Sequence, residues 1–200
     1  ANHPILESAL LYGGAPCKAL RHKFLMAQES ECHDITSPDF PAEIEVIPLP
    51  GHIFDMVGYR TPDDVVFLAD CVSSVATLEK YKIAYLYDVQ AYLDTLDYVD
   101  TLTAKLFVPS HTEPTEDIHE LTDTNRRCVL DVRDKILSIC AEPASFEAIL
   151  QRIFTDYGLS LNFEQYALVG STLRSYLSWL LDSGKLAVSF EDNLLLWRAV

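Results

Sequence analysis

The feature that most constrains the fold is a series of short apolar runs, separated by turns, between residues 43 and 111. Residues 43–49 (EIEVIPL), 56–61 (MVGYRT) and 65–70 (VVFLAD) have the length and apolar content of β-strands, and a Pro-Asp-Asp turn precedes the last of them. Residues 87–102 repeat apolar side chains with the period of an amphipathic helix, and 105–111 (KLFVPSH) returns to a strand pattern. This order predicts an α+β fold, in which a strand meander is joined through a helix to a further strand.

The rest of the chain is mostly helical in pattern. Helical periodicity covers residues 4–14, 17–29, 117–140, 146–158 and 162–184, with Ser145 as a predicted N-cap. Residues 185–200 form two apolar runs around a Glu-Asp-Asn turn, which is typical of a β-hairpin. Helix, helix, hairpin is the order of a winged-helix unit. We therefore predict a mixed α/β domain over 1–116, and a helical linker with a winged-helix-like domain over 117–200.

Composition limits the partners and the compartment. Thirty acidic residues against 15 basic ones give a formal net charge of −15, which disfavours binding to nucleic acid and to anionic membranes. No apolar run approaches the roughly 20 residues of a membrane span, and no secretory signal is visible. The five cysteines form no Cys-x-x-Cys pair, so we expect buried, inert thiols in a reducing compartment. These features predict a cytoplasmic protein.

Three polar residues follow apolar runs at corners of the predicted sheet. His52 comes after residues 43–49 in a Pro-Gly-His corner, Asp70 ends the run 65–70, and His111 ends the run 105–111. Strand ends deliver side chains into a common crevice, and two imidazoles with one carboxylate are suitable ligands for Zn²⁺, iron or manganese. Taken singly, each is explained as well by an ordinary turn residue. Together they predict a metal site at His52, Asp70 and His111.

These segments resemble a known family. The series LPGHIFDMVGY…DDVVFLADCV…LFVPSHTEP is similar to the second half of the metallo-β-lactamase fold hydrolases, over residues 1–120, and the tail resembles the winged-helix appendage of some members. The resemblance implies the second half of an αββα sandwich. It also implies a site for two divalent metal ions, with zinc expected, in which His52 binds the first metal, Asp70 bridges both and His111 completes the second.

Two departures from the family pattern bear on this expectation. Ala69 stands before the aspartate where the family commonly has glycine, which is tolerated if its backbone is not left-handed. The family's His-x-His-x-Asp-His signature, which supplies the other ligands, is absent from these 200 residues. We therefore expect the chain to be the C-terminal part of a longer hydrolase, and to be inactive alone. In the longer enzyme a metal-activated water would attack an ester, thioester or related small substrate.

Other functions stay open at this level. Some winged-helix-bearing relatives cleave RNA, and a winged-helix regulator would bind nucleic acid. The predicted recognition helix, however, carries only Arg174 as a strong cation, so its apolar side is expected to pack inside the protein or against another subunit. A catalytically silent interaction or scaffold domain is the third alternative. A half-sandwich also leaves an apolar sheet face to cover, which suggests a possible homodimer.

Overall fold

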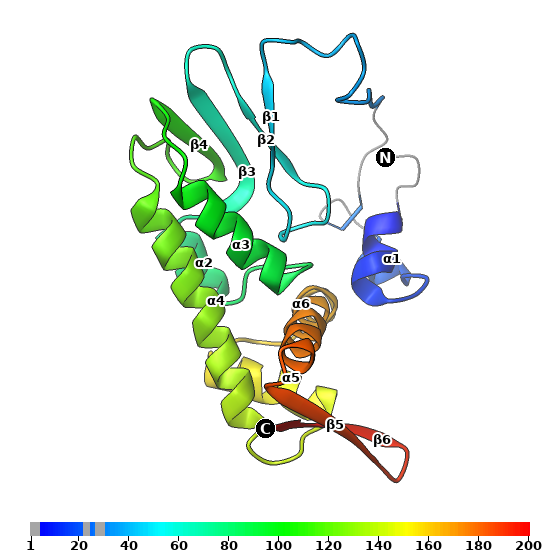
Figure 1. The fold of residues 1–200 in the computed structure, drawn as a ribbon. Coiled ribbons are helices and arrows are strands. Elements are labelled where there is room, and N and C mark those ends of the chain that lie inside the picture. Colours follow the sequence, from blue (N-terminus) through cyan, green and yellow to red (C-terminus); the bar gives the residue numbers. More distant parts are fainter. Residues whose placement is uncertain (1–4, 22–24, 27–30) are drawn as a thin grey trace.

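The computed structural model describes residues 5–21, 25–26 and 31–200 (Figure 1). The chain opens with helix α1 (Leu6–Tyr12), which confirms the helix expected over 4–14. A single 3-10 turn, η1 (Lys18–Leu20), follows. The helix expected over 17–29 is therefore wrong at its start, and residues 22–24 and 27–30 of that prediction lie outside the described part.

A four-stranded mixed sheet follows, in the order β1-β2-β3-β4. Strands β1 (Glu45–Pro48), β2 (Val57–Arg60) and β3 (Val65–Ser73) form an antiparallel meander, and β4 (Leu106–His111) pairs parallel to β3. Both the meander and the fourth strand confirm the prediction. Because β1, β3 and β4 run in the same direction, their C-terminal ends lie along one edge of the sheet.

Two helices connect β3 to β4. Helix α3 (Val89–Asp100) confirms the amphipathic helix expected over 87–102. Helix α2 (Val75–Tyr81) is not among the elements that the pattern predicts. It begins at Ser74, whose side chain accepts a hydrogen bond from the Thr77 N–H, so its local signal is an N-cap serine before a short helix.

The C-terminal part contains the helix, helix and hairpin that the pattern indicates. Its elements are α4 (His119–Ile139), α5 (Phe146–Asp156), α6 (Phe163–Asp182), β5 (Leu186–Glu191) and β6 (Leu194–Ala199). The side chain of Ser145 caps α5 as expected, by accepting a hydrogen bond from the Ala148 N–H. None of the helices in the described part of the chain is long and apolar enough to cross a membrane.

One hydrophobic cluster connects the sheet with the C-terminal helices. It runs from Ile47 and Val66 in the sheet, through α3 and α4, to Leu180 in α6 and Leu186 in β5. Helices α3 and α4 pack against β3 and cover one face of the sheet (Figure 1). The two predicted parts of the chain therefore share a continuous core.

The opposite face of the sheet is partly open. Side chains alternate between the two faces of a strand, so Val66 and Leu68 of β3 lie under the helices while Phe67 points away and is 42% exposed. Further apolar side chains on this open face are half-buried: Val46, Tyr59, Val65, Leu106 and Val108. The sheet thus presents a second apolar surface, as a single layer of a sandwich would.

The cysteines differ from expectation in part. Cys71 and Cys140 are buried, and burial raises the pKa of Cys71 to about 12 and that of Cys140 to about 11, so these two thiols are inert. Cys17 and Cys32 are exposed, and for them the expectation of buried thiols is wrong.

Candidate functional site

The Pro-Gly-His corner is fixed by hydrogen bonds to the start of α3. The Gly51 carbonyl accepts hydrogen bonds from the N–H groups of Tyr87 and Asp88, both at 3.0 Å. The Thr95 hydroxyl donates to the Pro50 carbonyl at 2.7 Å. These contacts join the loop after β1 to α3, and they set the direction in which His52 leaves the loop.

Glycine is required at position 51 for two reasons. Its φ of +121° is one that L side chains rarely adopt. A Cβ atom there would also lie 2.3 Å from both the Cα and the N of Tyr92, which belong to the backbone of α3. The corner and the helix can approach this closely only because no side chain separates them.

Asp70 lies inside β3 and not at its end. The strand continues to Ser73, so the expectation of a strand ending at residue 70 is wrong by three residues. The register against β4 shifts on either side of Ala69, which marks a β-bulge. Ala69 has a φ of +48°, which is a left-handed conformation. From the sequence, we expect alanine to be tolerated here only if its backbone is not left-handed, and the structure does not meet that condition. This bulge turns the Asp70 side chain toward the pocket.

The end of β3 is held by a buried asparagine of α4. The Asn125 Oδ1 accepts hydrogen bonds from the Ser73 N–H at 3.0 Å and from the Tyr92 hydroxyl at 3.2 Å. Its Nδ2 donates to the carbonyls of Ser73 and Leu121. One side chain, 2% exposed, therefore links β3, α3 and α4 behind the site. Sequence reasoning missed it, since nothing local distinguishes this asparagine.

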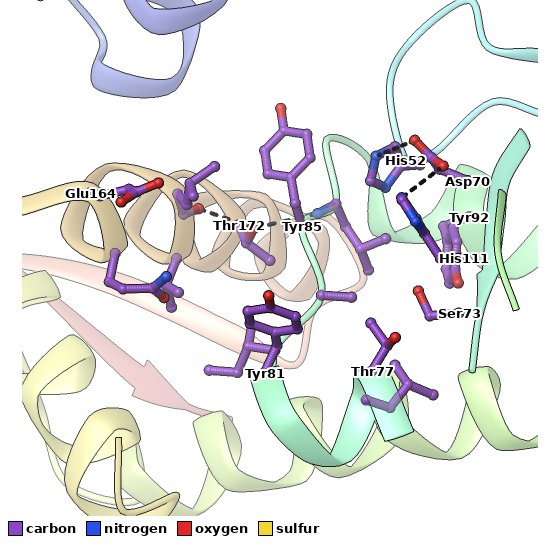
Figure 2. A pocket seen from close by; sticks show the side chains of 17 residues that line it. His52, Asp70, Ser73, Thr77, Tyr81, Tyr85, Tyr92, His111, Glu164 and Thr172 are labelled. Carbon is purple, nitrogen blue, oxygen red and sulfur yellow. Dashed lines mark hydrogen bonds and ion pairs between the residues drawn. The ribbon is translucent and has the colours of Figure 1, made fainter. Parts of the chain in front are cut away.

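His52, Asp70 and His111 converge, as the sequence predicts. The His111 Nε2 lies 3.2 Å from the Asp70 Oδ1, and the His52 Nε2 lies 3.7 Å from the Asp70 Oδ2 (Figure 2). Each oxygen of the carboxylate thus faces a different imidazole. The His52 ring also meets the Tyr85 ring edge-on, with 5.5 Å between centroids.

Burial favours the neutral form of His52. It lowers the pKa of His52 below its ordinary value of 6.5, against the opposing effects of the Asp70 charge and of a hydrogen bond to the Tyr85 backbone. His111 lowers it a little further. A neutral imidazole whose ring is held by a backbone group is the form that binds metal ions.

The donor set fits a metal in kind but not in number. Imidazole nitrogens and carboxylate oxygens are ordinary ligands for zinc. However, within residues 5–21, 25–26 and 31–200 no group of three or more His, Cys, Asp or Glu side chains is arranged to hold a metal ion. Each oxygen of Asp70 faces one imidazole, so each imidazole–carboxylate pair offers only two donors. On their own they form an incomplete site.

A pocket of about 490 Å³ opens beside these three residues. Its walls come from α2, from residues 83–86 and from α6, and they include Tyr81, Tyr85, Glu164 and Leu168 (Figure 2). From the sequence, we expect the apolar side of α6 to pack inside the protein or against another subunit. In the structure, Leu168 on that helix packs against a small core cluster and also lines the pocket.

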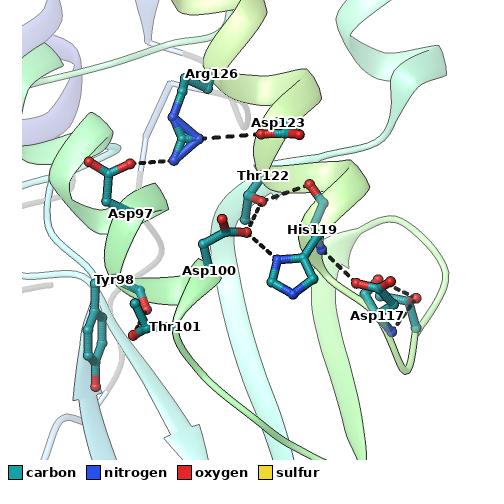
Figure 3. A network of polar contacts seen from close by, with 10 residues as sticks. Asp97, Tyr98, Asp100, Thr101, Asp117, His119, Thr122, Asp123 and Arg126 are labelled. Carbon is teal, nitrogen blue, oxygen red and sulfur yellow. Dashed lines mark hydrogen bonds and ion pairs between the residues drawn. The ribbon is translucent and has the colours of Figure 1, made fainter.

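A second polar cluster lies away from the pocket, between α3 and α4 (Figure 3). The Asp100 Oδ1 contacts the His119 Nδ1 at 2.7 Å and accepts a hydrogen bond from the Thr122 hydroxyl at 2.6 Å. Arg126 adds ion pairs with Asp97 and Asp123. This cluster fastens two helices together and shares no residue with the candidate site.

The fold is similar to that of two solved structures. No protein-family profile and no curated protein matches the sequence. A metallo-beta-lactamase family protein from Thermus thermophilus is similar in structure, with a TM-score of 0.61 and 13% identity over 78% of this chain. A beta-lactamase domain protein from Burkholderia ambifaria matches with a TM-score of 0.65 and 17% identity over 86%.

These likenesses define the fold. The matched regions are 49% and 53% of the two proteins, so the chain spans about half of their length. The chain shares the metallo-β-lactamase fold, with its mixed sheet and packed helices, and the resemblance drawn from the sequence motifs is confirmed at that level.

Proposed function

We propose that this chain is the C-terminal part of a metal-dependent hydrolase and contributes His52, Asp70 and His111 to a two-metal site. The observation that carries the proposal is the convergence of two imidazoles on the two oxygens of one carboxylate, at 3.2 and 3.7 Å. A carboxylate placed in this way between two histidines has the arrangement of a ligand that bridges two metal ions.

The remaining ligands come from outside this sequence in our proposal, because the described residues do not complete a site. Such a site would activate water for attack on an ester, thioester or related bond, with zinc as the expected metal. In this chain, the Tyr85 backbone holds the His52 ring, and the Asn125 link holds the strand that carries Asp70. The chain's own part is therefore to position ligands.

The proposed substrate is a small molecule and not a nucleic acid. In the winged-helix interpretation of the C-terminal part, α6 would be the recognition helix. Its Arg174 lies over the Phe146 ring, 4.1 Å from the centroid, and the tip between β5 and β6 is acidic. Phosphate binding needs several available cations, which this helix and hairpin do not offer. Together with the charge of −15, this favours a cytoplasmic enzyme of small substrates over an RNA-cleaving one.

A catalytically silent domain is the second candidate. The incomplete metal site favours it, since the described residues do not hold a metal by themselves. In the silent-domain alternative, a second copy of the chain would pack on the open face of the sheet around Phe67 to form a homodimer.

Metal content decides between these functions. Elemental analysis is made on this chain and on the full-length protein that carries it. We expect two equivalents in the full-length protein, little in the chain, and loss of metal in the full-length Asp70→Ala variant. His33→Ala is the matched control, because His33 is exposed and far from the pocket in sequence. Absence of metal from both wild-type samples would overturn the hydrolase proposal and leave the silent domain.

A further inference from the structure

The pocket beside His52 has a distinctive lining. Its volume of about 490 Å³ is within the usual range for small-molecule sites. Most of its wall is apolar or aromatic: Leu78, Tyr81, Ile83, Tyr85, Leu86 and Leu168. A ligand that fills this space must therefore present an apolar or aromatic body.

Two polar groups of the lining are already satisfied by the protein. The Tyr92 hydroxyl donates to Asn125, and the Thr172 hydroxyl accepts from the Leu86 N–H and donates to the Leu168 carbonyl. These residues present mainly their carbon atoms to the pocket. The polar part of a ligand must be recognised elsewhere in the lining.

The charged groups in the lining are of one sign, apart from the two histidines. Asp70 and Glu164 line the pocket, and no lysine or arginine does so among the residues that the structure describes. Glu164 lies on the first turn of α6, on the opposite side of the pocket from Asp70 in Figure 2. A ligand that spans the pocket therefore meets a carboxylate at each end.

The cation beside the Tyr81 wall lies outside the lining of the pocket. The Lys80 ammonium lies over the Tyr81 ring, 4.7 Å from its centroid, and lines a neighbouring hollow that shares Thr77, Tyr81 and His111 with the pocket. No lysine or arginine of the described lining faces Glu164, so its end of the pocket favours a positively charged group.

We propose that this pocket binds a small ligand with an apolar or aromatic body and a cationic end beside Glu164, and that it excludes carboxylates and phosphates of the same size. This proposal rests on the proposed function in one respect. If the chain is part of a hydrolase, the reactive bond of the substrate would lie at the end of the pocket formed by His52, Asp70 and His111. It makes ammonium-bearing esters, thioesters or amides the substrate class.

The test uses three probes with the same body and different charge: 4-phenylbutylamine, 4-phenylbutan-1-ol and 4-phenylbutyrate. Isothermal titration of the whole chain with each probe gives the affinities. We expect the amine to bind most tightly, the alcohol next and the butyrate least. A single half-exposed carboxylate gives a difference of about fivefold between amine and alcohol.

Matched variants locate the effect. Glu164→Gln removes the charge from the pocket, and we expect it to abolish most of the preference for the amine. Glu191→Gln, on the exposed hairpin, is the control and should leave all three affinities unchanged. Ala84→Phe fills the pocket and should weaken binding of every probe, with circular dichroism to show that it folds.

Several results would overturn the proposal. These are butyrate binding as tightly as the amine, no binding of any probe, or an unchanged preference in Glu164→Gln. Unaltered binding in a folded Ala84→Phe variant would do the same. The measurement involves neither metal nor turnover. A negative metal analysis therefore does not affect the order of the three probe affinities. A different order of affinities likewise does not affect the conclusion from the metal analysis.

Discussion

Replacing Gly51 by alanine tests whether the approach of the Pro-Gly-His corner to α3 is as close as the structure shows. The φ of +121° costs an alanine about 1–3 kcal/mol of backbone strain. The new Cβ would lie 2.3 Å from the Tyr92 backbone, and moving α3 away to relieve this overlap costs about 1–3 kcal/mol more. We therefore expect Gly51→Ala to lower the free energy of unfolding by about 2–6 kcal/mol.

Two other glycines separate the contributions. Gly14 has an ordinary φ and Gly158 a φ of +65°, and neither has an atom within 4 Å of a built Cβ. Gly14→Ala should be nearly neutral, and Gly158→Ala should lose about 1 kcal/mol from strain alone. Urea unfolding followed by circular dichroism gives all three values. A loss in Gly51→Ala no larger than that in Gly158→Ala would refute the close approach.

Three further predictions concern the bulge, the buried link and the helix-fastening cluster. Ala69→Gly removes the strain of a left-handed alanine, but the glycine also gives the unfolded chain more conformational freedom. We expect a net increase of about 0.5 kcal/mol in the free energy of unfolding, measured in urea. A decrease in this free energy would contradict the bulge geometry. Asn125→Ala leaves the buried Tyr92 hydroxyl and two backbone groups unpaired and should cost about 3 kcal/mol in the same assay, whereas a cost below about 1 kcal/mol speaks against the link. The hydrogen bond to Asp100 raises the pKa of His119 above 6.5, so its stabilisation is complete below pH 6.5 and is lost as pH rises through the raised pKa. Hydrogen bonds from Thr122 and His119 lower the pKa of Asp100 below 3.8, so its stabilisation is present above pH 3.8 and is lost as pH falls through the lowered pKa. His119→Gln should therefore reduce the urea midpoint at pH 5.5 and change it less at pH 8.5, and an equal change at both pH values contradicts the ion pair.

Much of the fold could be predicted because its signals are local. The meander over β1 to β3, the helix α3 and the hairpin β5-β6 follow from apolar periodicity and turn residues, which reflect which side of each element is buried. The pattern misses helix α2 although Ser74 caps it, and it predicts a helix where η1 makes only one turn. Short elements such as these depend more on their packing than on their own periodicity.

The candidate site was only partly predictable. His52 and His111 follow strands in the sequence, and parallel strand direction brings them to one edge, so their meeting at Asp70 could be expected. The left-handed Ala69 could not, because a bulge is set by the register of two strands that lie far apart in sequence. Nor could the role of Asn125, whose four hydrogen bonds reach three separate elements.

The sequence by itself indicated the order of the strands and of the longer helices, and it predicted His52, Asp70 and His111 as metal ligands; its motifs also showed the resemblance to the fold family. The elements and the candidate ligands depend on the spacing of apolar and polar residues along single segments, and that spacing can be read without knowing what the segment packs against. Only the tertiary structure decided that Gly51 lies against the backbone of α3, that Asp70 sits on a bulge, and that α6 closes an acidic pocket with Glu164. These features arise where segments distant in the sequence come into contact, and the free energy of such contacts is shared between partners that no local pattern identifies.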